Sequence, residues 1–115
     1  MNETCPPPWA ITPEKVDEAV RRLIEAAHPR QVILFGSYIR GQTHRDSDLD
    51  ALVVVDDSVA DPLQESARLR SRLRGLRLLL DIIVVQESRF NQLRDRIGLI
   101  YREAVRHGKV VYAAP

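Results

Sequence analysis

Two short polar motifs follow one another closely in this 115-residue chain. Gly36-Ser37 comes directly after the apolar run 31–35, and the range Ser47–Asp50 reads Ser-Asp-Leu-Asp. A glycine adopts backbone angles closed to other residues and lets a phosphate approach the main chain, while the free N–H groups at a helix start attract an anion. Two carboxylates two positions apart suit a hard divalent cation such as Mg²⁺. The two motifs together predict contact with one triphosphate, and hence nucleotidyl transfer.

The residues around these motifs could also take part in binding the phosphates. Ser37 is expected to start a short helix, on which Arg40 lies about one turn further and carries a charge suited to phosphate oxygens. Gly41 can end that helix. Two alternatives stay open, because Arg40 could equally be a surface arginine or face a partner. Similarly, Ser47 could bind phosphate or metal-bound water, or cap the aspartates that follow it.

Three aspartates are candidates for metal binding. Asp48 and Asp50 are two apart at the start of an expected strand, so their side chains point to the same face. Asp81 lies within the apolar run Leu78–Val85, which predicts a strand. An unpaired charge there would cost several kcal/mol, so Asp81 is expected to have a metal, a cationic partner or a shifted pKa. If the two strands are neighbours, the three carboxylates converge.

In this order and combination, the motifs resemble the nucleotidyltransferases of the DNA polymerase beta superfamily, and in particular the small stand-alone minimal nucleotidyltransferases (MNT). The resemblance covers nearly the whole chain. It implies that Gly36 and Ser37 hold the β and γ phosphates of ATP and that Asp48 and Asp50 bind Mg²⁺. It also implies that Asp81 lies near the incoming nucleophile, as a ligand of a second metal ion or as the acceptor of the hydroxyl proton.

The same resemblance implies a partner. Larger members of the superfamily add domains that bind the acceptor, and this chain is expected to have none. Stand-alone members commonly occur beside a small helical HEPN protein, a ribonuclease toxin. The resemblance therefore implies an antitoxin that transfers AMP from ATP to a tyrosine of that partner. Two alternatives stay open: a non-catalytic, nucleotide-binding antitoxin that neutralises its partner by contact, and transfer to a small molecule.

The elements that must position these residues alternate between helix and strand. We expect an α/β (α+β) fold, a small mixed sheet backed by helices on one side, in a single domain over 13–115 after an N-terminal tail over 1–12. The expected elements are a helix capped by Thr12 and ended before Pro29, strands 31–35 and 49–55, a helix capped by Asp61, the strand 78–85, helical turns from Ser88 or Asn91, an amphipathic helix over 97–107 closed by Gly108, and a strand 109–112.

Composition limits the remaining possibilities. The hydrophobic content of 44% suffices for one core. A net charge of +1 does not favour an extended nucleic-acid footprint. With one cysteine, Cys5, the chain has no disulfide framework, and no apolar run approaches the roughly 20 residues that span a membrane. We expect a cytoplasmic location.

The second expected helix carries an unusual number of arginines. Five of them lie between positions 68 and 77. They are expected either to form a solvated surface or to serve as a docking face for an acidic partner or RNA.

Overall fold

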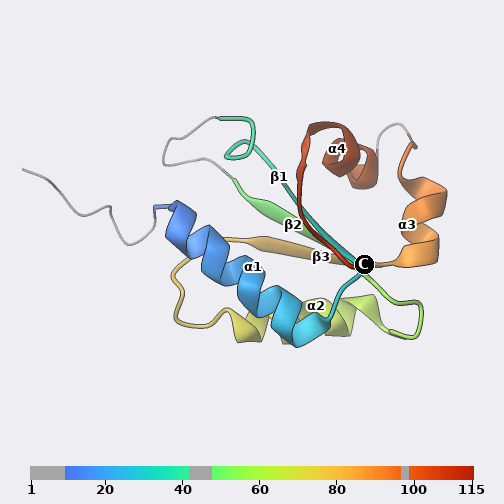
Figure 1. Ribbon diagram of the computed structural model, residues 1–115, viewed down its shortest axis with the longest axis horizontal. Helices are drawn as coiled ribbons and strands as arrows, with labels where there is room; N and C mark the ends of the chain where they lie inside the picture. The colour runs from blue at the N-terminus through green and yellow to red at the C-terminus, as the bar shows by residue number, and fades with distance from the viewer. Residues whose placement is uncertain (1–9, 42–47, 97–98) are drawn as a thin grey trace, which may run out of the picture.

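The structure, a computed structural model, describes residues 10–41, 48–96 and 99–115 (Figure 1). Most of the predicted N-terminal tail lies outside them. Within the described residues, four strands form one mixed sheet with helices packed on it, which confirms the predicted fold class. The elements in chain order are α1 (Pro13–Ala27), β1 (Gln31–Phe35), β2 (Asp50–Val55), α2 (Pro62–Arg72), β3 (Asp81–Gln86), α3 (Glu87–Leu93), α4 (Ile100–His107) and β4 (Lys109–Ala113).

The strand order β3-β2-β1-β4 brings the predicted functional motifs together at one end of the strands. β1 runs antiparallel to both β2 and β4, whereas β2 and β3 are parallel. The last residue of β1, Phe35, is paired with Asp50, and Asp50 is paired with Asp81 on the other side. The end of β1 and the starts of β2 and β3 therefore meet, and we call this end of the three strands the site edge.

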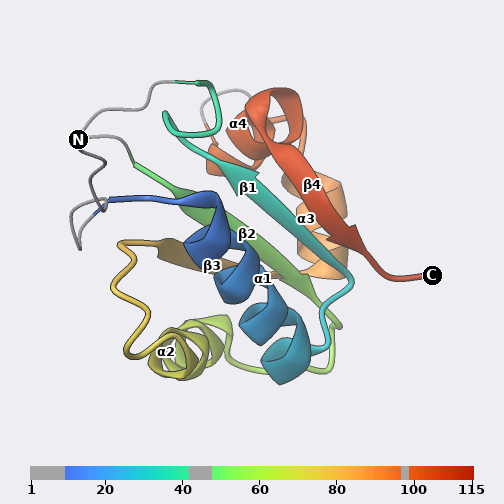
Figure 2. The ribbon, with the colours of Figure 1, turned by 60° about the vertical axis from the view of Figure 1, so that its left-hand side comes forward.

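Helices cover both faces of the sheet, so the expectation of helices on one side was wrong. α1 and α2 pack on one face, and α3 and α4 pack on the other (Figures 1 and 2). The reason lies in the strands, because every residue of β2 from Ala51 to Val55 is buried. A strand that is apolar on both faces needs cover on both. Phe90 of α3 and Ala104 of α4 complete the second core.

The first two helices begin where their capping residues predict. In α1 the hydroxyl of Thr12 accepts a hydrogen bond from the N–H of Lys15 at 3.2 Å. In α2 the carboxylate of Asp61 accepts one from the N–H of Gln64, also at 3.2 Å. Each helix has a proline in its first turn, where a missing N–H costs nothing. Across the described parts of the chain, no helix combines the length and the apolar character that crossing a membrane requires.

The third strand begins later than the apolar run suggests. β3 starts at Asp81, not at Leu78, and Leu79 is 84% exposed. The parallel ladder with β2 begins at the pair Asp50 and Asp81, so the preceding leucines have no partner on β2. Asp81 is consequently exposed at the site edge. The expected cost of burying its charge does not arise.

Candidate active site

Two of the predicted acidic residues lie side by side at the site edge. Asp50 and Asp81 are the first residues of adjacent parallel strands and are paired in register. The side chains of Leu52 and Ile83, two positions further along each strand, contribute to the core under α3 and α4. Because side chains alternate along a strand, both carboxylates lie on that same face. The two strands are therefore neighbours, which is the condition under which the sequence predicts converging carboxylates.

The electrostatics of Asp50 reflect this crowding. Burial, together with the negative charges of Asp48 and Asp81, raises the pKa of Asp50 to about 6 from its ordinary value of 3.8. Side-chain hydrogen bonds with the same two aspartates favour its protonated form further. Three acidic side chains thus share a region in which Asp50 is costly to ionise, and a cation placed among them would relieve that cost.

Asp48 shows the opposite behaviour, and Ser37 is the cause. Its Oδ1 accepts hydrogen bonds from Oγ of Ser37 at 2.5 Å and from the N–H of Ser37 at 2.7 Å. Oγ of Ser37 in turn accepts one from the N–H of Asp48 at 2.8 Å. These bonds hold the pKa of Asp48 below its ordinary value. Because the pKa values of Asp48 and Asp50 are shifted in opposite directions, the two carboxylates are suited to different tasks.

The main chain at Gly36 fits tightly against the acidic residues. Gly36 has a φ of 106°, which L side chains rarely adopt. A Cβ atom there would lie 2.8 Å from the carbonyl oxygen of Asp48 and 3.0 Å from Oδ2 of Asp50. Only glycine brings the end of β1 this close to both aspartates.

The segment after Gly36 differs from the expected short helix. It forms a single turn, in which the N–H groups of Ile39 and Arg40 point to the carbonyl of Gly36, and it closes at Gly41 with a φ of 89°. Its first amides are not free for an anion. The N–H of Ser37 is donated to the Asp48 carboxylate, and the N–H of Tyr38 to the Asp48 carbonyl at 3.0 Å.

Arg40 forms an ion pair that the sequence did not suggest. Its Nη1 lies 2.9 Å from Oε2 of Glu103 in α4, and both side chains are partly exposed. The charge of Arg40 still contributes to the lowered pKa of Asp48, as the last of several causes. Nothing in the sequence marks Glu103, because the contact joins residues 63 positions apart. Ser47, the remaining predicted phosphate-binding residue, lies outside the described residues.

The chemistry of these residues fits Mg²⁺, although no ready-made site is formed. The donor set consists of carboxylate oxygens, which this ion prefers. As the described side chains stand, no group of three or more His, Cys, Asp or Glu residues could hold a metal ion. Two observations explain this: Oδ1 of Asp48 is engaged by Ser37, and the environment of Asp50 favours its protonated form.

Comparison with known proteins identifies a family and two solved structures of similar fold. Residues 14–111 match the family model of the nucleotidyltransferase domain. No curated protein matches the chain. A proposed nucleotidyltransferase from Sulfolobus solfataricus, known from a crystal structure, is similar in fold with a TM-score of 0.51 and 19% identity, and the match covers 90% of each chain.

A second solved structure that is similar in fold is a toxin-antitoxin crystallised with AMP-PNP. The TM-score is 0.52 and the identity 24%, over 85% of this chain and 73% of the other. At these identities the two structures establish the fold only. The family model covers most of the chain, and on that basis this protein belongs to the nucleotidyltransferase domain family.

Proposed function

We propose that this chain is a Mg²⁺-dependent MNT-type nucleotidyltransferase that transfers AMP from ATP to a tyrosine hydroxyl of a HEPN-family partner, and so acts as an antitoxin. The observation that carries the proposal is the in-register pair of Asp50 and Asp81, with Asp48 beside them, at the site edge. Membership of the nucleotidyltransferase domain family supports the reaction class. The toxin-antitoxin of the same fold, crystallised with an ATP analogue, supports the nucleotide and the partner.

Asp48 and Asp50 have different surroundings, which suggests different roles. Asp48 is kept ionised by Ser37 and is held in one orientation. Asp50 is partly buried against Gly36 and would lose its proton when a cation binds. When bound, Mg²⁺ would supply Lewis-acid activation of the α-phosphate and neutralise the charge of the leaving pyrophosphate. Asp48 and Asp50 are the residues that would hold it.

Asp81 is accessible to an incoming acceptor, because it is exposed at the site edge. In the proposed step the hydroxyl oxygen of the acceptor forms a bond to the α-phosphorus of ATP. The bond from that phosphorus to the oxygen bridging to the β-phosphate breaks, and pyrophosphate leaves. Asp81 accepts the proton of the hydroxyl. The reaction otherwise depends on positioning and charge neutralisation.

The turn from Gly36 to Gly41 would hold the phosphates. In this role the N–H of Ser37 would exchange its hydrogen bond with Asp48 for one with a phosphate oxygen, as Asp48 turns to the metal ion. Arg40 is the cation of the turn and lies near enough to affect Asp48. Phosphate oxygens accept charge-assisted hydrogen bonds from such a guanidinium.

The proposal is tested by the mass of the partner. The purified chain is incubated with ATP, Mg²⁺ and the proposed HEPN-family partner, and the intact mass of the separated partner is then measured. We expect the added mass of one AMP on a tyrosine, and toxicity that stays lost after the antitoxin is removed. A partner that is silenced without any added mass would contradict the transfer.

One observation favours a second candidate, the nucleotide-binding antitoxin that acts by contact. Oδ1 of Asp48 is engaged by the N–H and the hydroxyl of Ser37, with which a metal ion would have to compete. The same experiment separates the two, because contact inhibition ends when the proteins are separated. The variant Asp50→Asn sharpens the comparison. If the chain acts by contact, this variant should still neutralise the partner. If the chain acts by transfer, the variant should leave the partner unmodified and toxic.

A further inference from the structure

The ion pair between Arg40 and Glu103 links the candidate phosphate-binding turn to α4, on the face of the sheet where the acidic residues lie. Nη1 of Arg40 and Oε2 of Glu103 are 2.9 Å apart, and the side chains are 42% and 40% exposed. α4 is fixed in place by Ala104, which is buried against the sheet. Glu103 therefore extends from an anchored helix to a cation near the end of a short turn.

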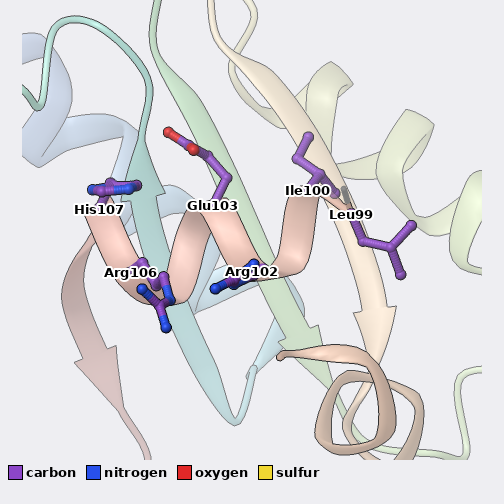
Figure 3. A pocket seen from close by; sticks show the side chains of 6 residues that line it. All are labelled: Leu99, Ile100, Arg102, Glu103, Arg106 and His107. Carbon is purple, nitrogen blue, oxygen red and sulfur yellow. The ribbon is translucent and has the colours of Figure 1, made fainter. Parts of the chain in front are cut away.

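Glu103 has other arginines nearby on its own helix but forms its ion pair with Arg40. Arg102, Arg106 and His107 line the same hollow along α4. Figure 3 shows the side chains of Arg102 and Arg106 on one side of the helix and that of Glu103 on the other. Within the described residues, the ion pair of Glu103 is with Arg40 and not with the arginines of its own helix.

We infer that Glu103 competes with the nucleotide for Arg40. This inference rests on the proposed function and specifies how the same site is regulated. In the free protein Glu103 holds the guanidinium beside the site, and an arriving triphosphate takes it over. Glu103 is thus a positioning residue that sets the affinity for nucleotide through Arg40.

The energetics favour this exchange. An exposed ion pair contributes little to the stability of the fold, because water screens the attraction and two long side chains must be held still. A triphosphate carries several negative charges and accepts paired hydrogen bonds from a guanidinium. After release, the carboxylate of Glu103 is solvated by water, since its side chain is 40% exposed. The carboxylate is therefore not left uncompensated when Arg40 leaves it.

The test is a double-mutant cycle read by the binding of ATP with Mg²⁺ in the absence of any acceptor. Because exposed pairs are weak, we expect Glu103→Gln to lower the Kd for ATP about two- to fivefold at low salt. The gain should shrink at high salt. Arg40→Gln should raise the Kd, and adding Glu103→Gln to Arg40→Gln should change nothing further.

A matched control comes from the opposite end of the strands. Glu87 is also a partly exposed glutamate beside an arginine, with its Oε1 3.7 Å from Nε of Arg30. It follows the last residue of β3, whereas the candidate site lies at the start of that strand. Glu87→Gln should leave the Kd unchanged, because it removes the same charge far from the turn.

The outcomes separate the possible failures. An unchanged or raised Kd in Glu103→Gln overturns the competition while leaving the proposed function standing. An equal gain in the Arg40→Gln background also overturns it, because Glu103 would then act by simple repulsion of the nucleotide and not through Arg40. Wild-type protein that binds no ATP would refute the proposed function itself, together with this inference.

Discussion

Removing the charge of Asp50 should make the metal-free protein more stable. The pKa of this carboxyl is about 6, against an ordinary value of 3.8, because the side chain is partly buried and faces the charges of Asp48 and Asp81. A difference of that size corresponds to roughly 3 kcal/mol at neutral pH. Asp50 is only partly buried and water screens part of the repulsion, so we expect Asp50→Asn to gain about 1–2 kcal/mol in the free energy of unfolding.

The gain should depend on pH in a defined direction. Well below pH 3.8 the carboxyl is protonated in both the folded and the unfolded protein, so it costs no stability. As the pH rises from about 4 to about 6, the unfolded chain loses its proton first and the wild type becomes less stable. Above pH 6 the full cost is present. The advantage of Asp50→Asn should therefore be small near pH 4 and reach its maximum above pH 6.

Urea unfolding in the presence of a chelator, at several pH values, measures this directly. Asp95→Asn is the matched control, because Asp95 is exposed and makes no hydrogen bond or ion pair among the described residues. Added Mg²⁺ should stabilise the wild type and not Asp50→Asn, which has lost a ligand charge. If Asp50→Asn proves less stable than the wild type at pH 7 without metal, the carboxylate has a structural partner and the argument from repulsion is refuted.

Three further predictions concern other parts of the molecule. Asp48→Asn should lower transfer about a hundredfold or more with the circular dichroism spectrum unchanged, and near-normal activity would exclude Asp48 as a ligand. Gly36→Ala should cost about 2 kcal/mol more in urea unfolding than Gly41→Ala, because both have positive φ but only Gly36 is crowded by neighbouring oxygens; equal losses would contradict this. Arg70→Glu combined with Arg74→Glu should weaken binding of the partner, because neither arginine has an ion pair among the described residues. The loss of binding should be smaller at high salt. Unchanged binding at low salt would indicate that this surface is only solvated.

Local patterns in the sequence predicted the local structure well. The cap at Thr12, the cap at Asp61 and the turn at Gly36 depend on neighbouring residues only, and each lies where it was expected. The sequence raised the possibility that the strands of Asp50 and Asp81 are neighbours, but it did not predict their register. The structure confirms that these strands are neighbours.

The features that were missed depend on distant contacts. The run from Leu78 to Val85 is apolar throughout, so the sequence alone cannot show that the strand begins only where β2 offers a partner, at Asp81. The same holds for the cost of burying a carboxylate, which falls on Asp50 and not on Asp81. The pair of Arg40 and Glu103 joins two polar residues with no pattern in common, and only the packing of α4 brings them together.

The central claim is that the acidic residues at the site edge catalyse transfer of a nucleotide to a protein. The most direct test uses ATP carrying radioactive phosphorus in either the α or the γ position, with Mg²⁺ and the proposed HEPN-family partner. We predict that the α label appears on that protein and the γ label in pyrophosphate, and that Asp50→Asn abolishes both. Label from the γ position on the protein, or α labelling that is as strong with Asp50→Asn as with the wild type, would contradict the account.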